Sequence, residues 1–303
     1  MGIRTILAAT DFSPAAERAV ERAAALAARH GATLHLLHVA PQGWLPRLRA
    51  WASGAAAASA ESGIETTLAA EASRIATARA IAVHPAVATG DPRLVIPAQG
   101  AALGVELIVV GAHGSHFVRE LLLGSTAWAA LALAGCPVLA VRLPPVQAYT
   151  EALAGTDLSA ASAAAIRTAA RLVPELHFTV LHAYEDPYGA GLLLADASSD
   201  AIERYREAAR VEAEQAIDRL LASLGDLGPR CARVVRHGPP VLRLREQLEA
   251  SGAQLLVLGA REKSGIERLL IGSVAEQMAL EAPCDVLLVR SRAEDAAAAR
   301  ASG

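Results

Sequence analysis

The amino-acid sequence predicts an α/β protein with two similar domains, each an open, mostly parallel five-stranded sheet with helices on both faces. Three observations predict it. The 303 residues are enough for two domains of about 150 residues each. A pattern of residues in the first half recurs in the second half. Within each half, short apolar segments alternate with helical ones, which favours a parallel sheet.

The repeat extends along most of the chain. TILAATDFS near the start corresponds to EALAGTDLS, and this alignment pairs Asp11 with Asp157. LIVVGA corresponds to LLVLGA, and PVLAVR corresponds to DVLLVR. We therefore expect one domain over residues 1–143, a second over residues 150–292 and a disordered tail over residues 293–303. The proline-rich segment LPPVQAY is the expected linker.

Five apolar segments of the first half are expected to be strands. They are rich in Val, Ile and Leu with few polar breaks, which is typical of strands buried on both faces. Their expected ranges are Thr5–Ala9, Thr33–Val39, Ala82–Ala88, Leu107–Val110 and Val138–Val141.

Helices are expected between these strands. Ser13 is a favourable N-cap, Pro14 suits the first helical position, and Gly31 suits the residue that follows the last turn. The run SGAAAASAES further on is interpreted as alanine-rich helix or as a mobile loop. The other expected helices are Ser62–Arg79, one from Asp91-Pro92 to about Leu103, and one that starts at Ser125.

One uncharged segment, Leu121–Val141, is about as long as a membrane-spanning helix. Its counterpart in the second half carries three carboxylates, those of Glu276, Glu281 and Asp285. Two copies of one architecture are not expected to lie in lipid and in water respectively. The sequence therefore predicts no membrane association.

Composition excludes several classes of partner. The formal net charge is −3, and Lys263 is the only lysine, so a nucleic-acid partner has little electrostatic support. The three cysteines, Cys136, Cys231 and Cys284, form no CxxC pair and no zinc spacing. Such a pattern fits a reducing compartment, and we expect a cytoplasmic protein without a disulfide framework and without a metal site.

Glycines with the spacing G-x2-G-x9-G-[ST] follow the fourth expected strand, at Gly111, Gly114 and Gly124. Open α/β sheets bind ligands at the carboxyl ends of their strands. Gly111 and Gly114 allow positive φ angles and let the backbone approach a bulky group without a Cβ in the way. A helix that begins after Gly124 presents free N–H groups and a partial positive charge, which suit a phosphate. Ser125 and Thr126 add hydroxyl donors.

The glycine motif occurs together with TDFS after the first strand and with a complete duplication. In these features the chain resembles the universal stress proteins in their tandem two-domain form. The resemblance covers nearly the whole chain. It implies a Rossmann-like sheet and a stress-response protein that binds an adenine nucleotide, ATP, with Mg²⁺ accompanying the phosphates. It also implies an internal pseudo-dimer through the last strands of the two halves, PVLAVR and DVLLVR, and is compatible with a homo-oligomer.

The resemblance also implies the site residues, carried over position by position. In the first half, Asp11 is expected on the ribose or adenine side, and the glycine loop is expected around the phosphates. The implied nucleotide-binding residues are Ala9, Thr10, Asp11, Val39, Gly111, Ala112, His113, Gly114, Ser115, His116, Phe117, Gly124, Ser125 and Thr126. A weaker second site is implied at Asp157, Ala183, Gly259, Gly272, Ser273 and Val274.

The second copy departs from the pattern where Glu262 replaces Gly114. A carboxylate at this position adds bulk and repels a triphosphate. Arg261, Lys263 and Gly265 are neighbours that can offset the change. We expect the first site to hold the nucleotide and the second half to act mainly as a scaffold.

Other chemistries have weaker support. The only lysine lies in GAREKSG, which lacks the second glycine of a Walker motif, and no GxSxG elbow or paired acid–base group is present. Histidines on or beside the second strands are interpreted as packed side chains and not as metal ligands: His35, His38 and His182. Contact with phosphate and exposure to solvent both stay open for His113 and His116. A helical face formed by Trp44, Leu48 and Trp51 is expected to cover the domain or to form an interface.

The sequence thus predicts a cytoplasmic, ATP-binding regulatory or interaction module with no catalytic residues. Two alternatives remain open: a slow ATPase at the same site, and a nucleotide-free scaffold.

Overall fold

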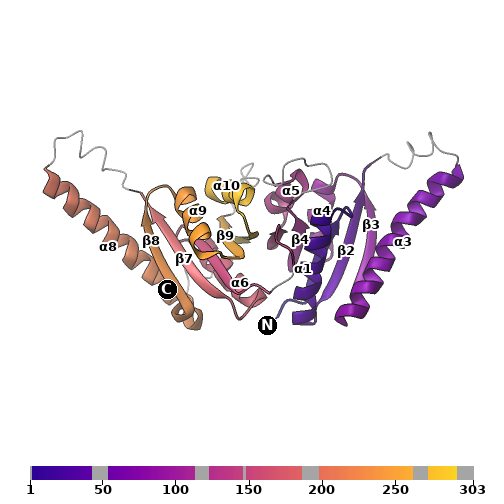
Figure 1. Cartoon of the computed structure of the whole chain (residues 1–303), viewed down its shortest axis with the longest axis horizontal. Helices are drawn as coiled ribbons and strands as arrows, with labels where there is room; N and C mark the ends of the chain where they lie inside the picture. Colours follow the sequence, from indigo (N-terminus) through magenta and orange to yellow (C-terminus); the bar gives the residue numbers. More distant parts are fainter. Residues whose placement is uncertain are drawn as a thin grey trace. The chain divides into compact units, whose positions relative to one another are not determined.

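The computed structural model describes residues 2–42, 54–112, 123–145, 148–185, 198–261 and 272–291. The chain divides into two compact units, Met1–Ala148 and Tyr149–Gly303. Each unit contains its own parallel sheet flanked by helices (Figure 1). The predicted fold class, two duplicated Rossmann-like α/β domains, is confirmed.

In the first unit, the strand order is β3–β2–β1–β4–β5, and all neighbouring strands are parallel. The chain adds strands outward from β1 in one direction and then in the other, so the order reverses between β1 and β4. A crevice forms at such a switch point. The strands are β1 (Thr5–Thr10), β2 (Thr33–Ala40), β3 (Val83–Thr89), β4 (Leu107–Gly111) and β5 (Val138–Val141).

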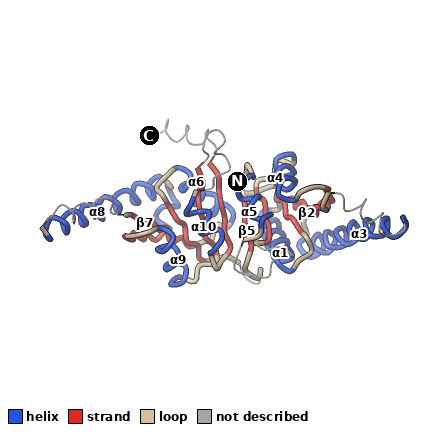
Figure 2. The backbone as a smooth tube through the Cα atoms, turned by 90° about the horizontal axis from the view of Figure 1, so that it is seen from above, coloured by secondary structure: helices blue, strands red, loops and turns tan. Residues whose placement is uncertain are grey.

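Helices cover both faces of this sheet. On one face α1 (Pro14–His30) packs against β1 and β4, and α3 (Gly54–Arg79) packs along β3. On the other face lie α4 (Pro92–Ala102) and α5 (Ser125–Leu133), which contact each other (Figure 2).

The second unit repeats this arrangement with the order β10–β9–β6–β7–β8. Its strands are β6 (Glu151–Thr156), β7 (His177–Tyr184), β8 (Cys231–His237), β9 (Leu255–Arg261) and β10 (Asp285–Ser291). Its helices are α6 (Ala160–Leu172), α8 (Ser199–Ser223), α9 (Pro240–Ser251) and α10 (Ser273–Glu281), with a short 3₁₀ helix, η1 (Gly225–Arg230).

The capping signals around α1 are confirmed. The Ser13 hydroxyl accepts a hydrogen bond from Ala16 N–H at 3.2 Å, and Pro14 occupies the first turn. Gly31 ends the helix with φ 62° and ψ 31°, the left-handed conformation that glycine adopts without strain. These caps fix where α1 begins, and therefore where the loop after β1 must turn.

The five strands predicted in the first half are present with nearly the same bounds, but the prediction that all of them are buried is wrong for β3. This strand is largely exposed because it is the edge of the sheet in its unit and α3 covers only one face. An edge strand also explains how Pro85, which has no N–H group to donate, is tolerated there.

One helical prediction needs adjustment, and the membrane-span alternative is set aside. The helix expected over Ser62–Arg79 begins earlier, at Gly54, so the alanine-rich run is helical, as alanine's high helix propensity favours. The uncharged segment Leu121–Val141 is not one helix, because α5 ends at Leu133 and β5 starts at Val138. Within the described ranges, no helix combines the length and the apolar character that a bilayer span requires.

Candidate functional site

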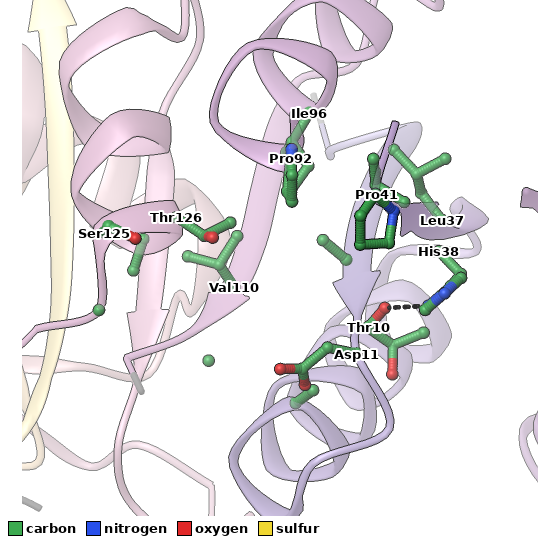
Figure 3. Close-up of a pocket in the computed structure, with 16 residues that line it drawn as sticks. Thr10, Asp11, Leu37, His38, Pro41, Pro92, Ile96, Val110, Ser125 and Thr126 are labelled. Carbon is green, nitrogen blue, oxygen red and sulfur yellow. Dashed lines mark hydrogen bonds between the residues drawn. The ribbon is translucent and has the colours of Figure 1, made fainter. Parts of the chain in front are cut away.

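A cavity of about 420 Å³ lies at the switch point of the first unit, where β1 and β4 end. Its volume falls in the usual range of small-molecule sites, roughly 300–1,000 Å³. Of the predicted nucleotide-binding residues, eight line it: Ala9, Thr10, Asp11, Val39, Gly111, Gly124, Ser125 and Thr126 (Figure 3).

Other predicted residues are not part of this lining. Ala112 is buried and does not line the cavity. The loop predictions at His113, Gly114, Ser115, His116 and Phe117 lie outside the described residues, and so do Trp44, Leu48 and Trp51.

The TDFS motif forms the turn that aims Asp11. The Thr10 hydroxyl accepts a hydrogen bond from Phe12 N–H at 3.0 Å, and Asp11 Oδ1 accepts one from Ser13 N–H at 3.0 Å. These bonds hold Phe12 at φ 60°, which non-glycine residues rarely adopt. The result is an exposed carboxylate that lines the cavity, two residues before the N-cap of α1 (Figure 3).

His38 braces the same turn. Its Nδ1 lies 2.9 Å from the carbonyl oxygen of Thr10. Since a carbonyl only accepts, Nδ1 carries the hydrogen. The ring also stacks on Phe12, with ring centroids 4.8 Å apart. The expectation that His38 is a packed strand-end histidine is therefore confirmed, and Phe12 and His38 position the site without having been predicted as site residues.

Gly111 has a different role from the one expected. Its φ is not positive, so the left-handed conformation that glycine allows is not used at this position. A Cβ at this position would lie 2.8 Å from both the carbonyl carbon and the oxygen of Ala15. Glycine is required because the first turn of α1 packs directly on the end of β4. That close approach brings Asp11 and the end of β4 to one cavity.

The N-terminus of α5 forms the opposite wall. Gly124 is its N-cap and offers no side-chain acceptor, so the N–H groups of the first turn have no side-chain cap. Gly124 N–H donates to the carbonyl of Ala112 at 2.6 Å, which ties the helix start to the end of β4. Ser125 and Thr126 line the cavity from this helix, and Figure 3 places them across Val110 from Asp11. Uncapped N–H groups and two hydroxyls make this wall a suitable anion site.

The remaining wall is apolar. It comes from the end of β2, the start of α4 and the end of β4. The sequence predicted these strands and this helix, but of their apolar residues here it predicted only Val39 as part of the site. Its side chains are Leu37, Val39, Pro41, Pro92, Ile96 and Val110. The cavity thus combines an apolar slot, an exposed carboxylate and a helix start that has no side-chain cap.

The second unit has a corresponding cavity of about 460 Å³. The predicted second-site residues Asp157, Ala183, Gly259, Gly272, Ser273 and Val274 all line it. The brace is repeated, with His182 Nδ1 3.0 Å from the carbonyl oxygen of Thr156. A Cβ at Gly259 would lie 2.5 Å from the carbonyl carbon of Ala161, closer still than in the first unit.

The two cavities differ at both polar ends. In the second, Asp157 Oδ1 accepts hydrogen bonds from the hydroxyls of Ser159 and Ser162, the latter at 2.7 Å. The residue that corresponds to Ser162 in the first unit is Ala16, which has no hydroxyl. At the helix wall, Val274 replaces Thr126, and Glu276 adds a carboxylate to the first turn of α10. The second cavity therefore has a serine hydroxyl that donates to its aspartate where the first has Ala16, and an added carboxylate at its helix start. Glu262, Lys263 and Gly265 lie outside the described residues, and the side chain of Arg261 does as well.

The fold and these cavities define a duplicated α/β protein with a nucleotide-sized cavity at the switch point of each half. The model of the universal stress protein family matches residues 2–142 and again residues 148–290. The chain belongs to the universal stress protein family, in a tandem arrangement.

Individual relatives agree with this assignment. The chain is 36% identical over 146 residues to universal stress protein A homolog 2 of Coxiella burnetii, a match that covers 46% of this chain and 95% of that protein. Several other curated relatives are matched over only 52% to 62% of their own length.

Solved structures extend the likeness to the whole chain. A universal stress protein from Archaeoglobus fulgidus superposes with a TM-score of 0.68 at 17% identity, covering 94% of this chain and 98% of that one. A universal stress protein solved in complex with cAMP covers 46% of this chain and 98% of its own, at 23% identity and a TM-score of 0.37.

Proposed function

We propose that the first cavity binds ATP and that the protein is a nucleotide-dependent regulatory or interaction module of the stress response. One observation carries the proposal: an exposed carboxylate, an apolar slot and a helix start without a side-chain cap meet in one cavity of about 420 Å³. The adenine would occupy the slot beside Leu37, Val39 and Ile96. Asp11 would accept hydrogen bonds from ribose hydroxyls.

The triphosphate would extend toward α5, where the Ser125 and Thr126 hydroxyls and the first-turn N–H groups donate to it. The described lining residues therefore suit both ends of ATP, the adenine and the triphosphate. Mg²⁺, when bound, would neutralise part of the phosphate charge and be held mainly through the phosphates, because no cluster of three or more metal-ligating side chains occurs among the described residues.

The test is calorimetric titration of ATP into the full chain and into Asp11→Asn. Asparagine keeps the Oδ1 acceptor that bonds Ser13 N–H, so the turn is preserved while the charged acceptor is lost. Hydrogen bonds to charged groups contribute about 1.5–3 kcal/mol, so we expect ATP affinity to fall by roughly tenfold or more. The matched control is Asp157→Asn, which should leave the affinity unchanged.

Equal loss from both variants, or no binding by the parent protein, would contradict the proposal. Chromatography of the nucleotide after incubation adds a second readout: recovery of intact ATP supports a binding module, whereas conversion to ADP identifies a slow ATPase at this site. Gel filtration with and without ATP tests whether the nucleotide changes assembly. Cytoplasmic location and the pairing of the two halves through their last strands stay predictions.

A further inference from the structure

The first unit contains a pair of histidines that the nucleotide cavity does not use. His35 on β2 is in register with His84 on β3. Their ring centroids are 5.5 Å apart and the ring planes are inclined by 31°. In-register residues of neighbouring strands point to the same face of a sheet. The fold thus brings together two imidazoles that lie far apart in the sequence.

The pair is accessible from solvent. β3 is the edge strand of its unit, His84 is exposed, and His35 is half-buried. Neither ring has a hydrogen-bond partner among the described residues, in contrast to His38 and His182, which a carbonyl holds in place. Each ring of the pair therefore keeps a nitrogen lone pair that no neighbouring group of the described chain occupies.

We propose that His35 and His84 bind a divalent late transition-metal ion and that the ion links β3 to β2. Zn²⁺ is the probe. Neutral imidazole is a preferred ligand of Zn²⁺, Cu²⁺ and Ni²⁺. Sequence reasoning missed this site: it interpreted His35 as a packed side chain and did not consider His84.

The geometry fits two ligands of one ion. With a metal–nitrogen distance of about 2.1 Å, the ion lies about 3.2 Å from the centroid of each ring that faces it. A centroid separation of 5.5 Å then corresponds to an angle of about 120° at the metal, close to the ~109° of a tetrahedral site. Among the described residues no third His, Cys, Asp or Glu completes a cluster, so water fills the other positions and the ion is exchangeable.

The protonation state also suits a ligand. Burial lowers the pKa of His35, and the nearby His84 lowers it further. Since the pKa of His35 is held below its ordinary value of 6.5, the ring is neutral at pH 7, the form that coordinates metals.

The second unit provides an internal comparison. The positions that correspond to His35 and His84 are Thr179 and Ala232, which are in register on β7 and β8. Neither side chain is a ligand for zinc, so the proposed metal site at these positions is confined to the first unit.

The experiment is calorimetric titration of ZnCl₂ into the full chain at neutral pH, with His84→Ala as the main variant and His35→Ala as the second. Because either change leaves a single ligand, we expect at least a tenfold loss of Zn²⁺ affinity in each. His237→Ala, on the edge strand of the second unit, is the matched control and should bind Zn²⁺ as the parent does. The double variant His113→Ala/His116→Ala controls for histidines outside the described residues.

Thermal unfolding gives a second readout. Zn²⁺ that bridges two strands of the folded state raises the Tm, and the rise should disappear in His84→Ala, whose exposed side chain is dispensable for folding. The proposal is overturned if His84→Ala binds Zn²⁺ as tightly as the parent, if only the His113→Ala/His116→Ala variant loses binding, or if the parent shows neither heat nor a Tm change.

Discussion

The two cavities share their backbone construction and differ in their chemistry. Both lie where the first and fourth strands of their unit end, and both keep the aspartate, the bracing histidine and the glycine against the first helix. The polar ends differ by Ser162 for Ala16, Val274 for Thr126 and Glu276 for Trp128. The apolar lining differs as well, with Ala183 for Val39, Leu244 for Ile96 and Leu258 for Val110. The shared features are those that folding requires, and the differing ones are those that a ligand would meet.

The largest effect should come from the glycines that both halves share. Gly111→Ala and Gly259→Ala force a Cβ against the backbone of the first helix of each unit, and overpacking of this kind costs about 1–3 kcal/mol or more. Gly259→Ala should be the more destabilising, because its contacts are 2.5–2.6 Å and those of Gly111 are 2.8–3.0 Å. Urea unfolding followed by circular dichroism measures both.

Gly135→Ala is the matched control, since a Cβ there meets no atom within 4 Å and should leave the urea midpoint nearly unchanged. If Gly111→Ala also left it unchanged, the glycine would serve the ligand alone and the comparison would fail.

A smaller effect is expected from exchanging one side chain between the helix starts. Thr126→Val copies the second half and removes a hydroxyl donor from the proposed phosphate wall, so ATP affinity should fall by about tenfold. Trp128→Glu copies the added carboxylate and should weaken ATP further through repulsion. Fluorescence titration with an ATP analogue measures both, with Val274→Thr as the control that leaves the tight site unchanged. Wild-type affinity in Thr126→Val would place the phosphates elsewhere.

A still smaller effect is expected from a substitution beside the aspartate of the second cavity. Ser162→Ala removes the hydroxyl that donates to Asp157 and copies Ala16, the corresponding residue of the first unit. The hydroxyl also accepts a hydrogen bond from Asp157 N–H, so its loss should cost about 1–3 kcal/mol of stability. The second cavity should gain affinity for adenosine by a few-fold, because the carboxylate of Asp157 has one donor fewer. Equilibrium dialysis with labelled adenosine would show this gain, and unchanged adenosine binding would mean that Asp157 does not limit the second cavity.

The smallest effect concerns acid stability, in which the two units should also differ. Asp91 caps α4, whereas Pro239 occupies the same position before α9 and has no side-chain cap. Hydrogen bonds from Arg93, through its side chain and its backbone N–H, hold the pKa of Asp91 below its ordinary value of 3.8. Because the folded pKa is depressed, the carboxylate stabilises the fold above pH 3.8 and loses this contribution as the pH falls through the folded pKa.

Asp91→Asn keeps the cap without the charge, so the decline in unfolding free energy below about pH 4 should become shallower. Urea midpoints measured between roughly pH 5 and pH 3 check this. An unchanged slope would show that the cap does not depend on the charge of the carboxylate.

Much of the fold could be predicted because its signals are local. Apolar strands, the Ser13–Pro14 start and the Gly31 stop of α1 depend on neighbouring residues, and the duplication supplied each element twice. The aspartates and helix starts of the two sites were also predictable, since parallel strands deliver their carboxyl ends to one edge of the sheet.

Features that depend on contacts between distant elements were not predictable. The role of Gly111 depends on how closely α1 approaches β4, and the exposure of β3 depends on its place at the edge of the sheet. The pairing of His35 with His84 likewise depends on two strands that the fold places side by side. Each of these is a tertiary relation that no spacing along the sequence encodes.

The central claim, that only the first cavity is a tight ATP site, is tested most directly by counting nucleotides. The purified chain would be stripped of ligand, saturated with ATP and Mg²⁺ in equilibrium dialysis, and assayed for bound ATP per chain. The account predicts about one ATP per chain at saturation of the tight phase, lost in Gly114→Glu and retained in Asp157→Asn. Two tightly bound nucleotides, or none, would contradict it.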